Sequence, residues 1–556
     1  MNGSWANNIA FKILLLLVSV SSFLVAILIS NRTGIRFLLI KNFLVSISFL
    51  SLTIIFVISR KFQDIMNIRP NRKVMSIFFS MGFILFLTVS FLLNGADTDY
   101  VVSEALDAIA YFIQAKIFST GQISVPSHEL REFFSTRFFI NDGKFYSKYF
   151  PGWPLVLSLG IVLRIPWGIN PIIGFLTLFV VYLIGKEIYD KRTGLFAVLL
   201  LASTFSFYWF TSTYMSEPSA LFFSSLFFYF VIKAIKGHKN LDLLLAGLSL
   251  GMTFLIRPYS ALTISLPTMT YFYFSSISKK RKSLIPFAII ILAFLPWFLM
   301  GLAYNYCQTG SILVTPHQYY NPFDTIGFGL RSTDVSNKPH LYTLFDGLKN
   351  LSINLLNLNL ETGLFLFLPF LFMNKKNKWD VLLISFIVTV IVSYILYFHR
   401  ALRYYYPVWF AVVLLVARGM HLSEITFSKL FPNISIKYLK YYFLVFMICS
   451  NICISISRDG ILNRYERYKQ FRDPFNVVKT NNLNNAIIFP RTVPGMYQDI
   501  GRYIQNSLDF SGDVLFARDL KEKNIKLMEY YPEKEFYYYD FDIKSKSGKL
   551  TKVNRN

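Results

Sequence analysis

The sequence has little cysteine and little charge. Its 556 residues include three cysteines, Cys307, Cys449 and Cys453, and none of them stands in the C-x-x-C spacing of a zinc or redox site. A disulfide framework and a cysteine-bound metal are therefore not supported. Charged residues make up 16% of the chain, against about 25% in soluble domains. We find no internal repeat and no low-complexity segment, which argues against a solenoid.

Long runs of apolar residues recur along most of the chain. Hydrophobic residues make up 54% of the chain, and the runs are long enough to cross a bilayer as helices. The first run, "IAFKILLLLVSVSSFLVAILIS", has no small-residue cleavage site behind it, so we expect a retained membrane helix. In all we predict about thirteen membrane helices, at about 9–30, 36–59, 76–93, 170–186, 194–211, 217–235, 240–256, 258–277, 284–303, 353–373, 379–397, 403–420 and 437–456.

The basic residues mark one side of the membrane. The formal net charge of +25 would suggest a nucleic-acid partner in a soluble protein. Here five short basic loops, including "GKEIYDKR", "KAIKGHKN" and "KKRK", fall on the same side when the runs are threaded in order. The positive-inside rule places that side in the cytoplasm. We therefore predict a multi-pass membrane protein that binds no nucleic acid.

The same threading divides the chain into three parts. We expect two extra membrane helices in 1–75, a membrane core in 76–456 with outer loops at about 94–153 and 304–352, and an outer C-terminal domain in 457–556. Alternating polar and apolar residues in "DVLFARDL" and "EFYYYDFD" predict short strands in that tail. The predicted fold class is an all-α polytopic membrane protein with a small C-terminal α/β domain.

One apolar segment is too short to span. "YFPGWPLVLSLGIVL" would also reverse the side of "GKEIYDKR" if it crossed the membrane. We therefore expect it to lie along the outer interface, with Tyr149 and Trp153 as aromatic anchors.

Acidic residues crowd at the start of the first outer loop. Asp97, Asp99, Glu104 and Asp107 fall within eleven positions. On a helix, Glu104, Asp107 and Tyr111 share one face, because they are separated by three and four residues. A solvated helix face is the more common explanation of such a pattern. At the membrane boundary, however, a carboxylate is also placed to act as a general base on a lipid-borne substrate.

Two further acidic motifs leave alternatives open. Glu217 in "MSEPSALFF" either serves catalysis or is a first-turn helix acid, with Ser216 as cap and Pro218 as an early helical residue. The "DTD" at 97–99 resembles a metal-binding D-x-D, but two aspartates are a weak signal. A divalent cation, Mg²⁺ or Mn²⁺, stays an open alternative, and no other cofactor is indicated.

Arginines stand at the predicted outer ends of helices. Arg257 lies in the tight turn "RPY", and Arg400 and Arg403 lie in "FHRALRYYYPVW" beside His399. An arginine near hydrocarbon costs about 2.5 to 3.5 kcal/mol on insertion scales, so it usually has a partner or a task. A guanidinium suits a phosphate, although Arg400 is also free to extend to the lipid head groups.

These motifs resemble a known family. "DAIAYFIQAKIFSTGQIS" looks like the acidic first-loop motif of C-type integral-membrane glycosyltransferases, the bacterial relatives of the dolichyl-phosphate-mannose protein mannosyltransferases and of the lipid A aminoarabinose transferase. Asp107 matches the acid of that motif, Tyr111 the tyrosine and Gly121 the glycine. Further ordered matches include "DGKFYSKYFPGWPLVLSLG", "LIRPYSALTISLP" and "YNYCQTGSILVTPHQYYNPFDTIGFG". The likeness covers roughly residues 76–420.

The resemblance implies a fold and a reaction. It implies helices around an outward-facing cavity and an inverting transfer of a sugar from a polyprenyl-phosphate donor to a glycan, lipid or protein acceptor on the periplasmic face of the inner membrane. It favours Asp107 over Asp97 and Asp99 as the catalytic acid/base residue. Arg257 and Arg403 are then expected to hold the donor phosphate, and Lys148 and Tyr149 to contact the donor near the interface.

The sequence departs from the family pattern at two positions. Ala108 follows the acid where many relatives have a second acid, and Glu217 stands where histidine is expected. We expect Glu217 to line the cavity, and its catalytic role and metal use stay open. A flippase for lipid-linked saccharide, which predicts broken helices and midplane charges, and a catalytically degenerate family member are the alternatives.

Overall fold

The computed structural model describes residues 103, 105–237, 239–278, 285–332, 338–375, 377–432, 439–456, 461–494 and 500–554, with isolated positions between 80 and 91. The predicted helices at 9–30 and 36–59 lie outside these residues, and so does nearly all of 76–93. Asp97, Asp99 and Glu104 lie outside them too.

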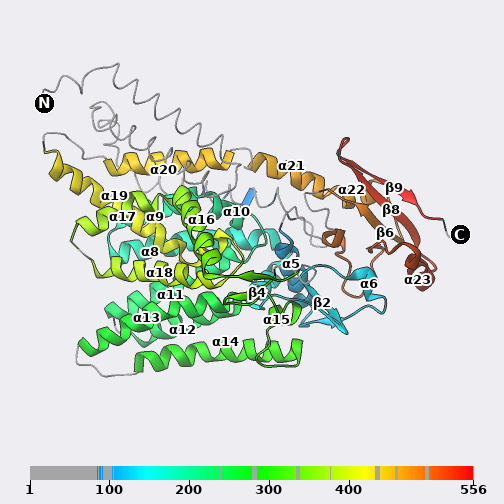
Figure 1. Ribbon diagram of the computed structural model, residues 1–556, viewed down its shortest axis with the longest axis horizontal. Helices are drawn as coiled ribbons and strands as arrows, with labels where there is room; N and C mark the ends of the chain where they lie inside the picture. Colours follow the sequence, from blue (N-terminus) through cyan, green and yellow to red (C-terminus); the bar gives the residue numbers. More distant parts are fainter. Residues whose placement is uncertain are drawn as a thin grey trace, which may run out of the picture.

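A bundle of long helices forms most of the molecule (Figure 1). Its helices are α8 (Pro166–Ile188), α9 (Lys191–Ser203), α10 (Phe205–Thr211), α11 (Glu217–Gly237), α12 (Asn240–Ile256), α13 (Pro258–Ser278), α14 (Ile285–Thr309), α16 (Leu344–Thr362), α17 (Leu364–Met373), α18 (Lys378–Ser393), α19 (Trp409–Leu430) and α20 (Leu439–Ile456). Two 3-10 turns, η2 (Tyr394–Leu396) and η3 (Leu402–Val408), connect α18 to α19. Buried side chains of α19, such as Trp409 and Phe410, lie in a hydrophobic core that also takes in α8, α9, α11 and α18.

Among the described residues, fewer helices are long and apolar enough to cross a membrane than the ten spans predicted there. Five helices in this part of the chain meet these criteria, or seven if two bent pairs each count as one span, whereas about thirteen are predicted for the whole chain. The five are Pro166–Ile188, Glu217–Gly237, Ile285–Thr309, Lys378–Leu396 and Leu402–Leu430. The predicted helices at 170–186, 217–235, 284–303, 379–397 and 403–420 correspond to these five.

Two of the predicted spans are broken. The run at 194–211 divides into α9 and α10 with a bend of 68°, because Thr204 has an extended backbone and caps α10 through its side chain. The run at 353–373 divides into α16 and α17 with a bend of 84°, where Gly363 takes a left-handed φ of 67°. Sequence hydropathy alone did not reveal either break.

The short apolar segment forms a helix, but its aromatic residues are not interface anchors. Helix α7 (Gly152–Val162) has 11 residues, which is too short to span. Trp153 is only 1% exposed, and its indole N–H donates to the backbone oxygen of Tyr214 at 2.7 Å. Tyr149 turns inward as well, into the cavity described below. The anchoring prediction is therefore wrong, because both polar tips find partners inside the protein.

The loop predicted to begin near residue 94 on the outer side, called the first outer loop, contains helices and a small sheet. Helix α5 (Leu106–Ser119) is followed by β1 (Val125–Pro126), α6 (Arg131–Phe134), β2 (Phe139–Asp142) and β3 (Lys144–Ser147), and the three strands pair antiparallel in the order β1-β3-β2. The second outer loop contains α15 (Pro316–Tyr320) and the hairpin of β4 (Gly329–Arg331) and β5 (His340–Tyr342).

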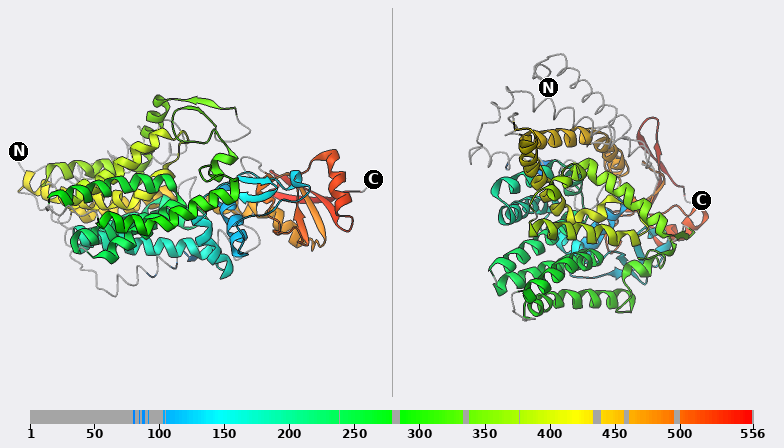
Figure 2. Two further views of the ribbon diagram at one scale, coloured as in Figure 1. Left: turned by 90° about the horizontal axis from the view of Figure 1, so that it is seen from below. Right: turned by 60° about the vertical axis from the view of Figure 1, so that its left-hand side comes forward.

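The C-terminal residues form an α/β unit at one end of the molecule (Figures 1 and 2). Its elements are α21 (Ile461–Phe471), α22 (Asp473–Thr480), β6 (Ala486–Thr492), η4 (Ile500–Tyr503), β7 (Val514–Phe516), η5 (Lys521–Lys523), α23 (Asn524–Tyr530), β8 (Glu535–Asp542) and β9 (Ser547–Lys552). Strand β6 pairs parallel with β7 and β8, and β9 closes the sheet antiparallel to β8. The strands predicted in "DVLFARDL" and "EFYYYDFD" are confirmed as β7 and β8.

Candidate active site

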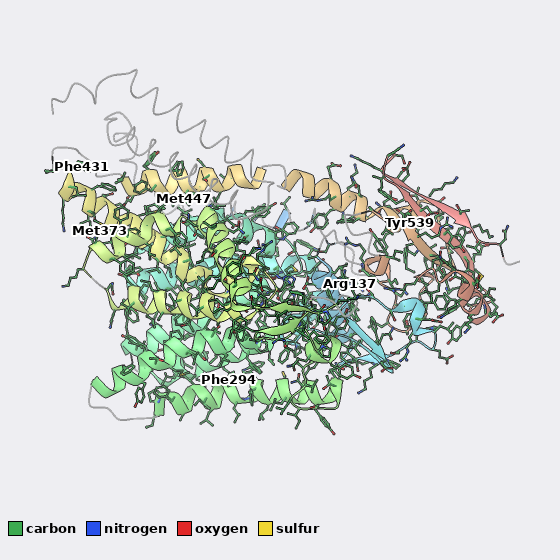
Figure 3. All side chains as sticks on the ribbon, viewed as in Figure 1. Arg137, Phe294, Met373, Phe431, Met447 and Tyr539 are labelled. Carbon is green, nitrogen blue, oxygen red and sulfur yellow. The ribbon has the colours of Figure 1, made fainter. Side chains whose placement is uncertain are left out.

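A large cavity lies where the outer loops meet the bundle. Its volume is about 960 Å³. One part is polar, and its side chains come from α5, from the residues that follow β3 and from the connections after α12, α14 and α18. The other part is apolar and runs between α12, α13 and α14, where Phe254, Leu262 and Phe294 are among the lining residues. Phe294 lies on α14, at the edge of the bundle (Figure 3).

Helix α5 places Asp107 and Tyr111 in the polar part. Asp107 lies in the first turn, where a carboxylate complements the helix dipole, and Gly121 takes a φ of +77° just after the helix ends. Both Asp107 and Tyr111 line the cavity, as their spacing of four residues predicts. The ring of Tyr111 packs on that of Tyr149 at 4.5 Å between centroids, and its hydroxyl lies 3.2 Å from Ser216 Oγ.

The carboxylate of Asp107 is held by two groups distant in sequence. Its Oδ1 accepts hydrogen bonds from the Tyr149 hydroxyl and from Arg403 Nη2, the latter at 3.3 Å. Burial opposes the charge on Asp107, but Arg403, the Tyr149 hydroxyl and Lys148 outweigh burial and hold the pKa of this carboxyl well below its ordinary value. These contacts therefore favour the ionised form of Asp107.

Two arginines connect Asp107 to Glu217. Arg257 Nη2 lies 2.6 Å from Glu217 Oε1, and Arg403 Nε lies 4.0 Å from the same oxygen. Arg257 also donates to the backbone oxygen of Arg403 at 3.2 Å. Both guanidinium groups line the cavity, so they present two adjacent positive charges to any ligand there.

The position of Glu217 differs from the prediction. Its side chain is 0% exposed and does not line the cavity, because Arg257 lies in front of it. Glu217 is the first residue of α11, as predicted by the alternative interpretation, in which it is a first-turn helix acid. A buried carboxylate in this place fixes the two arginines, so its contact with a ligand would be indirect.

Lys148 belongs to a second polar group, which the sequence motifs did not predict. Its Nζ lies 3.6 Å from Asp324 Oδ2 and 4.5 Å from the centroid of the Phe138 ring. Asp324 also accepts from Tyr397 at 3.0 Å and lies 2.7 Å from His317 Nε2. Burial lowers the pKa of Lys148 despite the two nearby carboxylates, Asp324 and Asp107. Asp324 and His317 lie in a stretch that the sequence marked only as a family-like block, without a role.

The structure thus brings six predicted residues together around the cavity and leaves two others, Glu217 and Arg400, outside its lining. Those that line the cavity are Asp107, Tyr111, Lys148, Tyr149, Arg257 and Arg403. Arg400 is exposed and is not part of the lining, whereas its neighbour His399 is. No group of three His, Cys, Asp or Glu side chains among the described residues is arranged to hold a metal ion.

The fold and the cavity define a multi-pass membrane protein with a charged site at the outer-loop end of its bundle and an apolar groove leading away from it. Residues 164–300 match the family model for dolichyl-phosphate-mannose-protein mannosyltransferase. A comparison with curated proteins gave no match.

Two solved structures of ArnT from Cupriavidus metallidurans share the fold. The structure bound to undecaprenyl phosphate is 10% identical, with a TM-score of 0.55 over 84% of this chain and 94% of ArnT. The apo structure is 10% identical, with a TM-score of 0.52 over 84% of this chain and 93% of ArnT. At this identity the likeness is one of fold. With the family match, it confirms the resemblance to the membrane glycosyltransferases that the sequence motifs indicated.

Proposed function

We propose that this protein is an inverting glycosyltransferase that uses a polyprenyl-phosphate-linked sugar. The observation that carries the proposal is the cavity itself, in which Asp107, Arg257 and Arg403 line one part and an apolar groove the other. A donor with a phosphate and a long hydrocarbon chain needs both surfaces next to each other. ArnT, which shares the fold, has been solved with undecaprenyl phosphate bound.

The proposed reaction follows from the positions of the charges. An acceptor hydroxyl attacks the anomeric carbon of the donor sugar while Asp107 accepts the hydroxyl proton. The bond between that carbon and the phosphate oxygen breaks, and the oxygen keeps the electron pair. Arg257 and Arg403 stabilise the negative charge that grows on the departing phosphate. The products are an inverted glycoside and polyprenyl phosphate.

The remaining residues orient these groups. The Tyr149 hydroxyl holds Asp107, and Tyr111 packs against Tyr149. Glu217 fixes Arg257 through the 2.6 Å ion pair. Lys148 adds a third cation to the same cavity wall and is placed to contact the donor phosphate. We place the site on the periplasmic face of the inner membrane, with a glycan, lipid or protein as acceptor.

Asp107→Asn tests the proposal directly. General-base catalysis contributes about 10²- to 10⁴-fold, so transfer should fall at least about a hundredfold while expression stays normal. Mass spectrometry of envelope glycans, lipids and proteins would compare a deletion strain with the Asp107→Asn strain, and a sugar missing from both would name the product. The matched control is Asp142→Asn, since Asp142 is an exposed carboxylate outside the cavity. Near-normal glycosylation in the Asp107→Asn strain would refute the role of Asp107.

One observation favours the alternative that the protein is a flippase. The two bent helix pairs are the broken helices that a transporter predicts and that the sequence did not show. Each break has a local explanation, however: Gly363 takes a left-handed φ at one, and Thr204 has an extended backbone and caps α10 at the other. Reconstituted protein that moves lipid-linked sugar across vesicles without forming a glycosidic bond would decide for a flippase.

A further inference from the structure

A second cavity lies at the end of the bundle opposite the Asp107 site. Its volume is about 450 Å³, and the residues around it come from the start of α9, the middle of α19 and the start of α20. On α19, Ala417 and His421 face this cavity. They follow Arg403 by 14 and 18 residues, which is roughly 20 to 27 Å along a helix at 1.5 Å per residue. This distance approaches the thickness of the hydrocarbon core.

Positive charge dominates the lining. Lys191, Arg192 and Lys440 face a single carboxylate, Asp190. Asp190 is already engaged with its own helix, because it accepts from Arg192 N at 2.8 Å, Thr193 N at 2.9 Å and Thr193 Oγ1 at 3.0 Å. Within the described part of the chain, neither Lys191 nor Arg192 forms an ion pair.

Lys440 makes the pocket more than an exposed basic loop. The residue is only 9% exposed, and its ammonium lies 3.2 Å from Glu424 Oε1. That ion pair holds Lys440 in the pocket wall, while Phe196 and Ala417 add apolar surface beside it. The cavity thus combines an anion-binding rim with an apolar wall between membrane helices.

We propose that this pocket binds the phosphate head group of an anionic phospholipid. Basic pockets between membrane helices suit such head groups, because the cations meet the phosphate while apolar side chains contact the glycerol and the acyl chains. The position of the pocket between membrane helices favours a lipid over free phosphate, because a lipid reaches it from the bilayer with its acyl chains alongside the helices. The proposal does not depend on the chemistry at Asp107.

The test is a lipid titration of the full-length protein. Palmitoyl-oleoyl phosphatidylglycerol, or the zwitterionic phosphatidylcholine of the same chains, is added to the detergent-solubilised protein, and bound lipid is counted by native mass spectrometry. Phosphatidylglycerol should bind at a concentration about tenfold lower than phosphatidylcholine. Equal binding of the two lipids would overturn the proposal.

Variants locate the site. Lys191→Gln together with Arg192→Gln removes the two cations without an ion pair and should weaken phosphatidylglycerol binding about tenfold. The matched control is Lys429→Gln, since Lys429 is exposed on α19 and outside the pocket, and its affinity should change less than about twofold. Arg192→Gln alone changes an exposed residue and serves if the double variant does not fold; it should weaken binding about threefold.

Free phosphate is the competing ligand. Inorganic phosphate and glycerol 3-phosphate are added at millimolar concentration to the lipid-bound protein. If the lipid is the ligand, neither should displace phosphatidylglycerol from the wild type. Displacement by either, or equal lipid loss in the Lys429→Gln control and the double variant, would contradict the assignment.

Discussion

At the scale of single residues, the central feature is the sharing of Arg403 between two carboxylates. Arg403 lies 3.3 Å from Asp107 Oδ1 and 4.0 Å from Glu217 Oε1. A donor phosphate bound to Arg403 would compete with Asp107 for this cation. In the proposed reaction, Asp107 therefore becomes a stronger base when the donor is present, because the charge that holds its pKa down is then shared with the phosphate.

The pH dependence of transfer tests this coupling. Arg403 stabilises the ionised form of Asp107, so Arg403→Gln removes that stabilisation and leaves the burial, and the pKa of Asp107 rises. The acid limb of the pH–rate profile should therefore move to higher pH, beyond any general loss of activity. The matched control is Arg400→Gln, since Arg400 is exposed and outside the cavity, and it should leave the profile unchanged. An unshifted acid limb in Arg403→Gln would contradict the coupling.

The same contacts determine how the contribution of Asp107 to the free energy of unfolding changes with pH. The pKa of Asp107 is lower in the folded protein than in the unfolded chain. Its contribution to the free energy of unfolding is thus present above the unfolded pKa and is lost as the pH falls through the folded value. Asp107→Asn should accordingly destabilise the protein more at neutral than at strongly acidic pH.

At the scale of elements, the cavity depends on the close packing of α12 and α14. Gly247 and Gly251 lie on α12 four residues apart, as in the G-x-x-x-G motif of packed membrane helices. A Cβ on Gly247 would lie 2.4 Å from the backbone oxygen of Ile290, and one on Gly251 would lie 2.1 Å from the Trp297 ring. Since both helices line the apolar groove, their separation determines its width.

Gly251→Val should therefore separate the two helices. Overpacking of this kind costs typically about 1 to 3 kcal/mol, so we expect a lower midpoint temperature of unfolding in detergent and weaker binding of polyprenyl phosphate. Gly237→Val is the control, because a Cβ on Gly237 meets no atom within 4 Å. If the two variants have the same midpoint temperature of unfolding, the contact of α12 with α14 does not determine the width of the groove.

At the scale of the whole molecule, the C-terminal unit and the first outer loop share a core. Phe133 and Phe134 of α6 are 0% and 2% exposed and pack with Ile487, Phe489 and Leu515 of the C-terminal sheet. The backbone joins them as well, since Arg518 N donates to the oxygen of Phe133 at 2.8 Å. The loop that carries Lys148 and Tyr149 is thereby fixed to the C-terminal sheet.

Phe133→Ala combined with Phe134→Ala tests this connection. Each truncation of a buried phenylalanine costs about 3 to 5 kcal/mol, so limited proteolysis should cut the first outer loop and the C-terminal unit faster. Phe345→Ala is the matched control, since Phe345 is 77% exposed. Unchanged cleavage in the double variant would mean that the two parts hold their positions independently. Lost transfer with intact folding would show that the C-terminal unit supports the site.

The features that the sequence predicted depend on residues that are neighbours in the chain. Contacts between residues far apart in the chain could not be predicted in this way. Apolar run length and period-two alternation are local properties, so they predicted the five spanning helices, the helix that pairs Asp107 with Tyr111, and strands β7 and β8. Hydropathy did not predict the breaks at Thr204 and Gly363, because it contains no information on backbone angles.

A basic, apolar, multi-pass chain with an acid, Asp107, and arginines at helix ends follows from the order of the residues alone. Which of these side chains meet depends on how the chain folds: Arg403 reaches Asp107 across 296 positions, and Arg400, three residues earlier, does not line the cavity. The tertiary fold also pairs Glu217 with Arg257 and Asp324 with Lys148. The physical reason is that spacing along one helix fixes which residues share a face, whereas charge pairing between loops depends on how separate helices pack.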